Sequence, residues 1–100
     1  MGVVRFSNRA ESDLFEIGEY TLRIWGEAQA IRYLDELEDR CHSLADHSLA
    51  GRSCDEIRPG LYRQEQGKHV IFFRRDQAGI FVLRILHQRR LPEIHPFEES

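Results

Sequence analysis

Two strongly apolar segments separated by a short turn constrain the fold of this 100-residue chain more than any other feature. His69 to Arg75 and Ile80 to His87 are rich in β-branched, aromatic and aliphatic residues, and the residues between them, Asp76 to Gly79, are typical of a turn. The second segment is apolar on both faces of its pleat. It therefore predicts a central strand covered on both sides, or one covered by helices and partly by a partner.

Shorter segments extend this predicted sheet. Leu61 to Gln64 predict a third strand, joined to the first apolar segment by a hairpin turn. Asp55 to Arg58 are expected to begin the sheet region, just before a turn marked by a proline and a glycine. Val3 to Phe6 predict a short strand that is too brief to be stable alone and so adds to the same sheet.

The residues between these strands show helical periodicity in two consecutive segments. Asn8 with Glu11 three places later resembles a capping box, and Gly26 is expected to end the first helix. The apolar stripe of the first helix comprises Ala10, Leu14, Ile17, Thr21 and Trp25. The stripe of the second helix comprises Ala30, Leu34, Leu37, Cys41 and Leu44. Two such helices joined at a glycine predict an antiparallel helical hairpin.

These elements predict the α+β class. A chain of this length accommodates one core, so we expect a single domain over residues 1–100, with about 91–100 forming a loose C-terminal tail. The helical hairpin is expected to pack on one face of a mostly antiparallel sheet of three to four strands, including the short N-terminal one. The other face of the sheet is expected to be concave and set with arginines.

Charge is distributed unevenly along the chain. Residues 1–50 hold five arginines against ten acidic residues, whereas residues 51–90 hold nine basic residues against four acidic ones. The last ten residues carry three glutamates and no basic residue. Such an asymmetry indicates a partner that faces one part of the molecule.

Several classes of protein are disfavoured by composition. The two cysteines, Cys41 and Cys54, do not make a disulfide framework. Cys41 falls on a helical stripe and is expected to be buried. Cys54 lies in a turn-like stretch and is expected to be more exposed. The spacing of cysteines and histidines predicts no metal site, and no cofactor is expected. No apolar run approaches the roughly 20 residues of a membrane span, and the N-terminus lacks the features of a signal peptide. We therefore expect a cytoplasmic protein without a membrane partner.

Four segments together resemble the ParE toxins of the RelE/ParE superfamily of bacterial type II toxin–antitoxin systems. They are W-G-E-A-Q-A-I-R-Y-L-D-E-L at 25–37, G-R-S-C-D-E-I-R-P-G-L-Y-R at 51–63, G-K-H-V-I-F-F-R at 67–74 and I-L-H-Q-R-R at 85–90. The resemblance runs from about Val4 to Arg90, with the segments in the order and spacing of the family. No single segment is specific; the combination is.

The resemblance implies a function that spacing and composition do not show. ParE toxins inhibit DNA gyrase and are held inactive by a ParD antitoxin, so the chain is expected to form a toxin–antitoxin hetero-oligomer. The antitoxin is expected to lay a helix on the helical hairpin and an extended segment toward the sheet. No catalytic residue and no direct binding to DNA are expected of such a toxin. The related RelE enzymes instead cleave mRNA on the ribosome with basic residues of the sheet and the C-terminus.

The helical hairpin carries more apolar residues than one sheet face needs, which favours a groove for an amphipathic partner helix. A wide buried face or a toxin dimer would also explain the excess. Trp25 continues its helical stripe, which favours a place in the core, with a half-exposed anchor for the antitoxin as the alternative. Arg58 and Arg63 flank a bend and would receive acidic antitoxin residues, or form salt bridges. The predicted antitoxin-binding residues are Phe15, Leu22, Trp25, Ile31, Arg58 and Arg63.

The remaining basic residues of the C-terminal half have three interpretations. In the first, they contact the target by protein–protein binding; these residues are Arg74, Arg84, His87, Arg89 and Arg90. In the second, Arg84, Arg90 and His95 are catalytic residues of a metal-independent, RelE-like ribonuclease. The net acidity of the chain speaks against tight RNA binding. In the third, the arginines are solvated or pair with acids across strands, in an inactive toxin-like interaction module.

Overall fold

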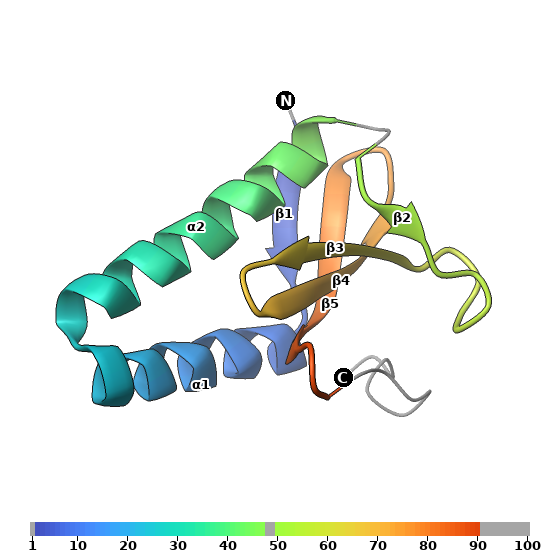
Figure 1. Cartoon of the computed structure of the whole chain (residues 1–100). Coiled ribbons are helices and arrows are strands. Elements are labelled where there is room, and N and C mark those ends of the chain that lie inside the picture. Colours follow the sequence, from blue (N-terminus) through green and yellow to red (C-terminus); the bar gives the residue numbers. More distant parts are fainter. Residues whose placement is uncertain (1, 48–49, 91–100) are drawn as a thin grey trace.

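The computed structural model describes residues 2–47 and 50–90, which form two helices and one sheet (Figure 1). The elements are β1 (Val3–Phe6), α1 (Asn8–Trp25), α2 (Glu27–Asp46), β2 (Arg52–Ser53), β3 (Tyr62–Gln66), β4 (His69–Arg75) and β5 (Gly79–His87). The strand order is β1-β5-β4-β3-β2, with β1 parallel to β5 and all other neighbours antiparallel. The predicted α+β class is confirmed. The sheet has five strands rather than three or four, because the two-residue β2 is too short to show a sequence period.

The two helices form the predicted hairpin around Gly26. This glycine has φ 92°, a backbone conformation that other residues adopt only with strain, and its N–H donates to the carbonyl of Leu22. The start of α1 differs from the prediction at Asn8. Ser7 is the N-cap, and its Oγ accepts a hydrogen bond of 3.0 Å from the N–H of Ala10.

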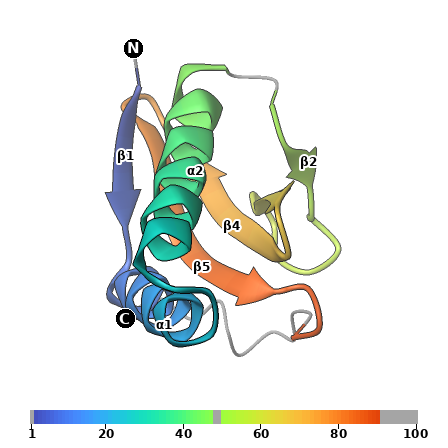
Figure 2. The same cartoon turned by 60° about the vertical axis from the view of Figure 1, so that its left-hand side comes forward.

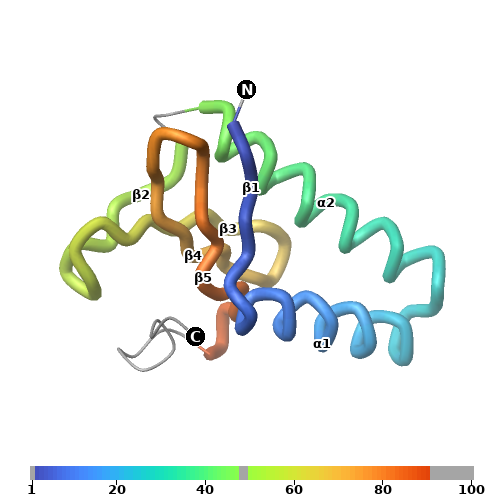
Figure 3. Tube along the Cα trace, turned by 180° about the vertical axis from the view of Figure 1, so that it is seen from behind, coloured from blue at the N-terminus to red at the C-terminus, as the bar shows by residue number. Residues whose placement is uncertain are grey.

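The helical hairpin extends past the edge of the sheet. α1 and α2 meet at their Gly26 end beyond the strands and spread apart toward them (Figures 1 and 3). Trp25, the last residue of α1, is 67% exposed. The preferred interpretation of Trp25 as a core residue was therefore wrong, because the helical period continues beyond the point where the sheet supplies a surface to pack on.

The main core lies between the hairpin and one face of the sheet. The predicted stripe of α2 is confirmed at Ala30, Leu37, Cys41 and Leu44, which are all buried, and Leu34 is half-buried. Leu37, Cys41 and Leu44, with Leu34 at the margin, pack with strand residues of the sheet, namely Ile71, Phe73, Ile80, Val82 and Ile85. Burial raises the pKa of the Cys41 thiol to about 12, which keeps the thiol protonated and unreactive at neutral pH.

The opposite face of the sheet is partly covered by the chain itself. A second core there consists of Cys54, Leu61, Val70, Phe72, Leu83 and Leu86. The segment from Cys54 to Leu61 connects β2 to β3 and contributes to this core (Figure 2). Two predictions for this segment were wrong. Residues 55–58 form a turn rather than the start of a strand, and Cys54 is buried rather than exposed.

A register shift between β4 and β5 lies where β5 meets the start of α1. Phe73 pairs with Val82 but Phe72 pairs with Arg84, so Leu83 is an extra residue on β5. Ser7 binds this point twice, because its N–H donates to the carbonyl of Val82 and its Oγ donates to the carbonyl of Leu83 at 2.7 Å. The same hydroxyl that caps α1 thus attaches the helix to the sheet.

No helix among residues 2–47 and 50–90 has the length and apolarity that crossing a membrane requires.

Replacing Ser7 tests this junction. Ser7→Ala leaves the N–H of Ala10 and the carbonyl of Leu83 without their buried partner, so we expect the free energy of unfolding to fall by about 2 kcal/mol. Urea unfolding followed by circular dichroism measures the change. Ser12→Ala, at an exposed position of α1, is the matched control and is expected to cost less than about 0.5 kcal/mol. Equal unfolding midpoints for the two variants would contradict the role given to Ser7.

Candidate partner-binding surfaces

An open apolar groove runs between α1 and α2. It has a volume of about 330 Å³ and its apolar lining comprises Leu14, Phe15, Leu22, Ala30, Ile31 and Leu34. Three of these large side chains are more than half exposed: Phe15 at 67%, Leu22 at 52% and Ile31 at 54%. Exposed apolar side chains gathered in a groove are typical of interaction sites.

The floor of the groove depends on Gly18. A Cβ placed on this residue would lie 3.1 Å from Cδ1 of Leu34, which is closer than side chains ordinarily pack. Glycine in the middle of a helix is normally unfavourable, by roughly 0.5–1 kcal/mol relative to alanine. Here it lets α1 approach the side chain of Leu34 on α2 closely.

The structure divides the predicted antitoxin-binding residues into three places. Phe15, Leu22 and Ile31 line the groove together. Trp25 lies at the end of the hairpin, three residues beyond Leu22, and is exposed. Arg58 and Arg63 belong to the β2–β3 connection and to β3, and they do not line the groove.

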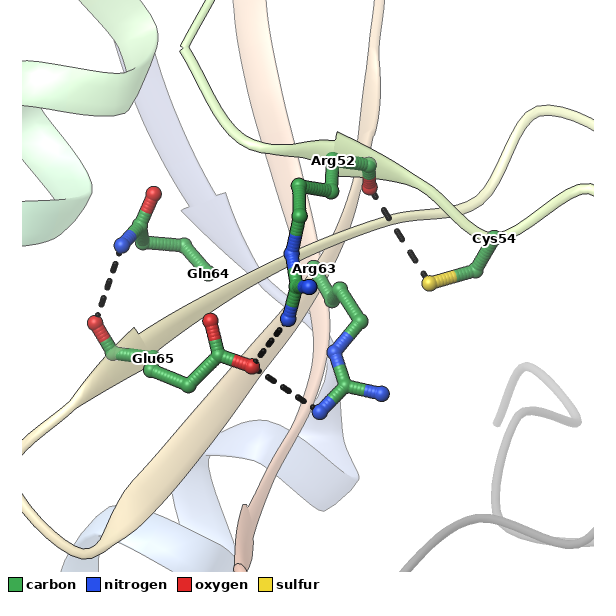
Figure 4. A network of polar contacts seen from close by, with 5 residues as sticks. All are labelled: Arg52, Cys54, Arg63, Gln64 and Glu65. Carbon is green, nitrogen blue, oxygen red and sulfur yellow. Dashed lines mark hydrogen bonds and ion pairs between the residues drawn. The ribbon is translucent and has the colours of Figure 1, made fainter.

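Arg63 takes part in a polar network on the sheet. Its Nη2 donates to Oε2 of Glu65 at 2.9 Å, and Nη2 of Arg52 donates to the same oxygen at 2.6 Å (Figure 4). The guanidinium also lies 5.7 Å above the ring of Phe72. Burial alone would raise the pKa of Glu65, but hydrogen bonds and the two neighbouring arginines lower it. Of the two interpretations of Arg63, the structure of the chain without a partner shows the salt bridge.

Arg84 is committed to a buried ion pair with α1. Its Nε and Nη2 donate to the two carboxylate oxygens of Asp13 at 2.8 and 2.9 Å, and the two side chains are only 14% and 11% exposed. Oδ2 of Asp13 also accepts a hydrogen bond from the N–H of Ile85 at 2.9 Å. Ile85 lies beyond Val82, which is the last residue of β5 that pairs with β1. Hydrogen bonding to Asp13 raises the pKa of Arg84. Asp13 therefore satisfies both a guanidinium and an edge N–H of the sheet.

Arg74 contacts a different part of β5. Its guanidinium lies 5.3 Å from the ring centroid of Phe81, and Arg5 lies 5.7 Å from the same ring. Arg5 also forms an ion pair with Asp76, and this hydrogen bond is the main reason that the pKa of Asp76 is lowered. Phe81 thus carries two cations, one from each neighbouring strand.

The C-terminal end of β5 opens onto two hollows beside α1. One, of about 380 Å³, contains both Arg84 and Arg90, together with Asp13. The other, of about 400 Å³, contains His69, His87 and Arg90. Arg89 and Arg90 are exposed. Arg90 therefore lies beside Arg84 in one hollow and beside His87 in the other, and Arg74 lines neither. His95 lies outside the described residues.

His69 is held neutral in the second of these hollows. Its Nδ1 lies 2.6 Å from the hydroxyl of Tyr33, and its ring stands edge-on to that of His87 at 5.3 Å. Burial, followed by the proximity of His87, lowers the pKa of His69 to about 4. The Tyr33 hydroxyl also accepts the N–H of Lys68, so one side chain of α2 binds the turn between β3 and β4.

Sequence reasoning missed Asp13, Gly18 and the two acids of the groove, Glu19 and Glu27. Asp13 was detectable in principle, since it stands between Ala10 and Ile17 at helical spacing on the buried face of α1. Its partner could not be identified, because Arg84 is 71 residues away. Gly18 and the groove acids gave no periodic signal.

Comparisons with known proteins agree with this architecture. The sequence model of the family described as "ParE toxin of type II toxin-antitoxin system, parDE" matches residues 4–92. The chain belongs to the ParE toxin family. Toxin ParE1 of Mycobacterium tuberculosis is 43% identical over 84 residues, which cover 83% of this chain and 86% of the relative. Toxin ParE1 of Caulobacter vibrioides is 34% identical over 91 residues, which cover 91% and 94%.

A solved structure supports the fold of this ParE-family chain. A structure titled "Chromosomal ParDE TA system from P. aeruginosa" matches with a TM-score of 0.72 and 20% identity, and the match covers 87% of this chain and 96% of that one. At this identity the match shows the fold alone. It confirms the predicted ParE-like arrangement of a helical hairpin on a sheet.

Removing Asp13 is expected to destabilise the fold strongly. Asp13→Ala leaves the Arg84 guanidinium buried without its carboxylate and the Ile85 N–H without an acceptor, so we expect a loss of about 3 kcal/mol in the free energy of unfolding. Asp35→Ala, which removes an exposed carboxylate of α2, serves as the control. In the double variant with Arg84→Met the loss should be smaller than the sum of the two single losses. Additive losses would mean that the pair is not coupled.

The lowered pKa of His69 predicts that stability depends on pH. The unfolded ring binds a proton below about pH 6.5, whereas the folded ring binds one only near pH 4, so stability should fall as the pH is lowered through that window. Chemical unfolding at several pH values between these limits measures the slope. His69→Gln removes the titrating ring and should flatten it. An unchanged slope in this variant would show that other groups cause the dependence.

Proposed function

We propose that this chain is a toxin that inhibits DNA gyrase by protein–protein binding and is neutralised by a ParD-like antitoxin. The observation that carries the proposal is the open apolar groove between α1 and α2 in a chain that belongs to the ParE family. The family resemblance supplies gyrase and ParD as the expected partners. The proposed target places the activity in the bacterial cytoplasm.

The groove suits an amphipathic helix of the antitoxin. Phe15, Leu22 and Ile31 expose apolar surface that a partner helix would bury, and such helices dock through apolar residues spaced three, four and seven apart. Trp25 extends this surface toward the hairpin end, where an exposed tryptophan is a common source of binding energy. Arg58 and Arg63 would meet a later segment of the same antitoxin on the sheet side.

The proposed gyrase-binding residues are Arg74, Arg84, His87, Arg89 and Arg90. Arg89 and Arg90 are exposed at the end of β5 and are available for direct contact. Arg84 is held by Asp13, so its proposed contribution is to fix the end of β5 and α1 rather than to donate freely to the target. Association would be steered by charge, and electrostatics would affect the encounter rate and selectivity more than affinity.

The environment of Arg84 also supports binding over catalysis. Metal-independent RNA cleavage needs a mobile proton donor, a base and cations directed at the phosphate. The Arg84 guanidinium directs its Nε and Nη2 hydrogen bonds at Asp13, and His69 is a weak base with a pKa of about 4. The ribonuclease and the inactive interaction module remain as outcomes of the test.

A gyrase supercoiling assay with purified protein tests the proposal. We expect inhibition that increases with toxin concentration and is reversed by the antitoxin encoded alongside. Arg90→Ala should weaken inhibition gradually, by about tenfold or less, because a binding contact rather than a chemical step is lost. Uninhibited supercoiling together with mRNA cleavage on ribosomes would establish the ribonuclease instead, and inertness in both assays would establish the interaction module.

A further inference from the structure

The helical hairpin is strongly acidic, whereas the charged residues predicted to contact partners are basic. α1 and α2 together contain ten Asp and Glu residues against four arginines, a net charge of −6. The rest of the described chain is basic. A partner that docks on the hairpin therefore meets a potential of the opposite sign from a partner that docks on the far face of the sheet.

The acidic residues follow the apolar groove. Glu19 of α1 and Glu27 of α2 are part of its lining. Helical spacing continues the same line, because Glu11 lies four residues before Phe15, and Glu38 lies four residues after Leu34. The groove thus has an apolar floor and an acidic rim on both helices.

Within the described residues, none of the four arginines of the hairpin forms an ion pair with this rim. Arg9 lines the hollow that contains Asp13, and Arg40 donates to Gln66 on β3. Arg23 lies over the ring of Tyr20, and neither it nor Arg32 lines the groove. Within residues 2–47 and 50–90, Glu19 and Glu27 have no ion pair and no side-chain hydrogen bond. Covering them with an uncharged or acidic partner would remove water from unpaired carboxylates, which is costly.

We propose that the helix bound in this groove carries lysine or arginine residues on both flanks of its apolar face. The proposal rests on the proposed function, since it describes the antitoxin segment of that same site. Leu14 and Leu22 are eight residues apart, about 12 Å along α1, so two to three turns of partner helix fill the groove. The basic flanks then meet Glu19 on one side and Glu27 on the other.

The proposed basic flanks specify more than a generic amphipathic helix. If Arg58 and Arg63 receive acidic residues of the same antitoxin, its charge changes sign along the segment that wraps the toxin, from basic at the hairpin to acidic at the sheet. Such a pattern fixes the direction in which the segment binds and disfavours antitoxins with acidic helices, because like charges would face each other at the rim.

Two designed peptides test the inference. Both have the same stripe of leucine and isoleucine at helical spacing and no tryptophan; one has lysines on the flanks and the other has glutamates. Anisotropy of a labelled peptide gives the dissociation constant with the full chain, and the emission of Trp25, the single tryptophan, reports whether the peptide lies at the hairpin. We expect the lysine peptide to bind at least about tenfold more tightly at about 50 mM salt, and the difference to shrink at about 500 mM.

Charge-reversal variants assign the preference to the rim. Glu19→Lys combined with Glu27→Lys should abolish or invert it. Glu36→Lys combined with Asp39→Lys introduces the same charge change at exposed residues that line a separate hollow beside Arg40, and it should retain most of the preference. The control corrects for the effect of net charge.

The outcomes separate this inference from the proposed function. Equal binding of the two peptides overturns the basic-flank proposal and leaves a groove that accepts helices of any charge. Tighter binding of the glutamate peptide also overturns it. A preference that survives reversal of Glu19 and Glu27 also overturns it. If neither peptide nor the co-encoded antitoxin binds the chain, both this inference and the proposed antitoxin site fail.

Discussion

The architecture depends on how α1 is held against the C-terminal half of β5. β1 pairs with β5 only as far as Val82, after which the edge of β5 needs other partners. Ser7 and Asp13 supply them, with bonds to the carbonyls of Val82 and Leu83 and to the N–H of Ile85. A one-residue bulge at Leu83 and the Arg84 guanidinium complete the junction. α1 and its N-cap therefore replace the missing strand with one backbone and two side-chain hydrogen bonds.

This junction determines where the hairpin lies and what it leaves uncovered. α1 and α2 are anchored near the sheet and extend beyond it, so the buried stripes end before the helices do. The close approach at Gly18 leaves a shallow groove on the flank of the hairpin, with Phe15, Leu22 and Ile31 exposed in it. Exposed apolar side chains gathered in this way are typical of a surface that a partner covers.

The positive charge of the C-terminal half is less available to a partner than the number of its basic residues suggests. Arg84 is paired with Asp13, Arg63 and Arg52 share Glu65, and Arg5 is paired with Asp76. The far face of the sheet also has its own small core under the β2–β3 connection. The exposed cations Arg89 and Arg90 lie instead at the end of β5, beside α1. The proposed partner contacts are thus distributed between an acidic groove and a basic strand end.

The sequence by itself determined the class of the fold, the two helices with their turn at Gly26, and the strands β3, β4 and β5. These features follow from local periodicity and from glycine conformation, which act over a few residues. Only the tertiary structure decided that Trp25 is exposed, that Cys54 is buried, that Ser7 rather than Asn8 caps α1, and that Arg84 belongs to Asp13. Each of these depends on which distant segment lies opposite. The Asp13–Arg84 pair spans 71 residues, and no local pattern in either segment contains the other.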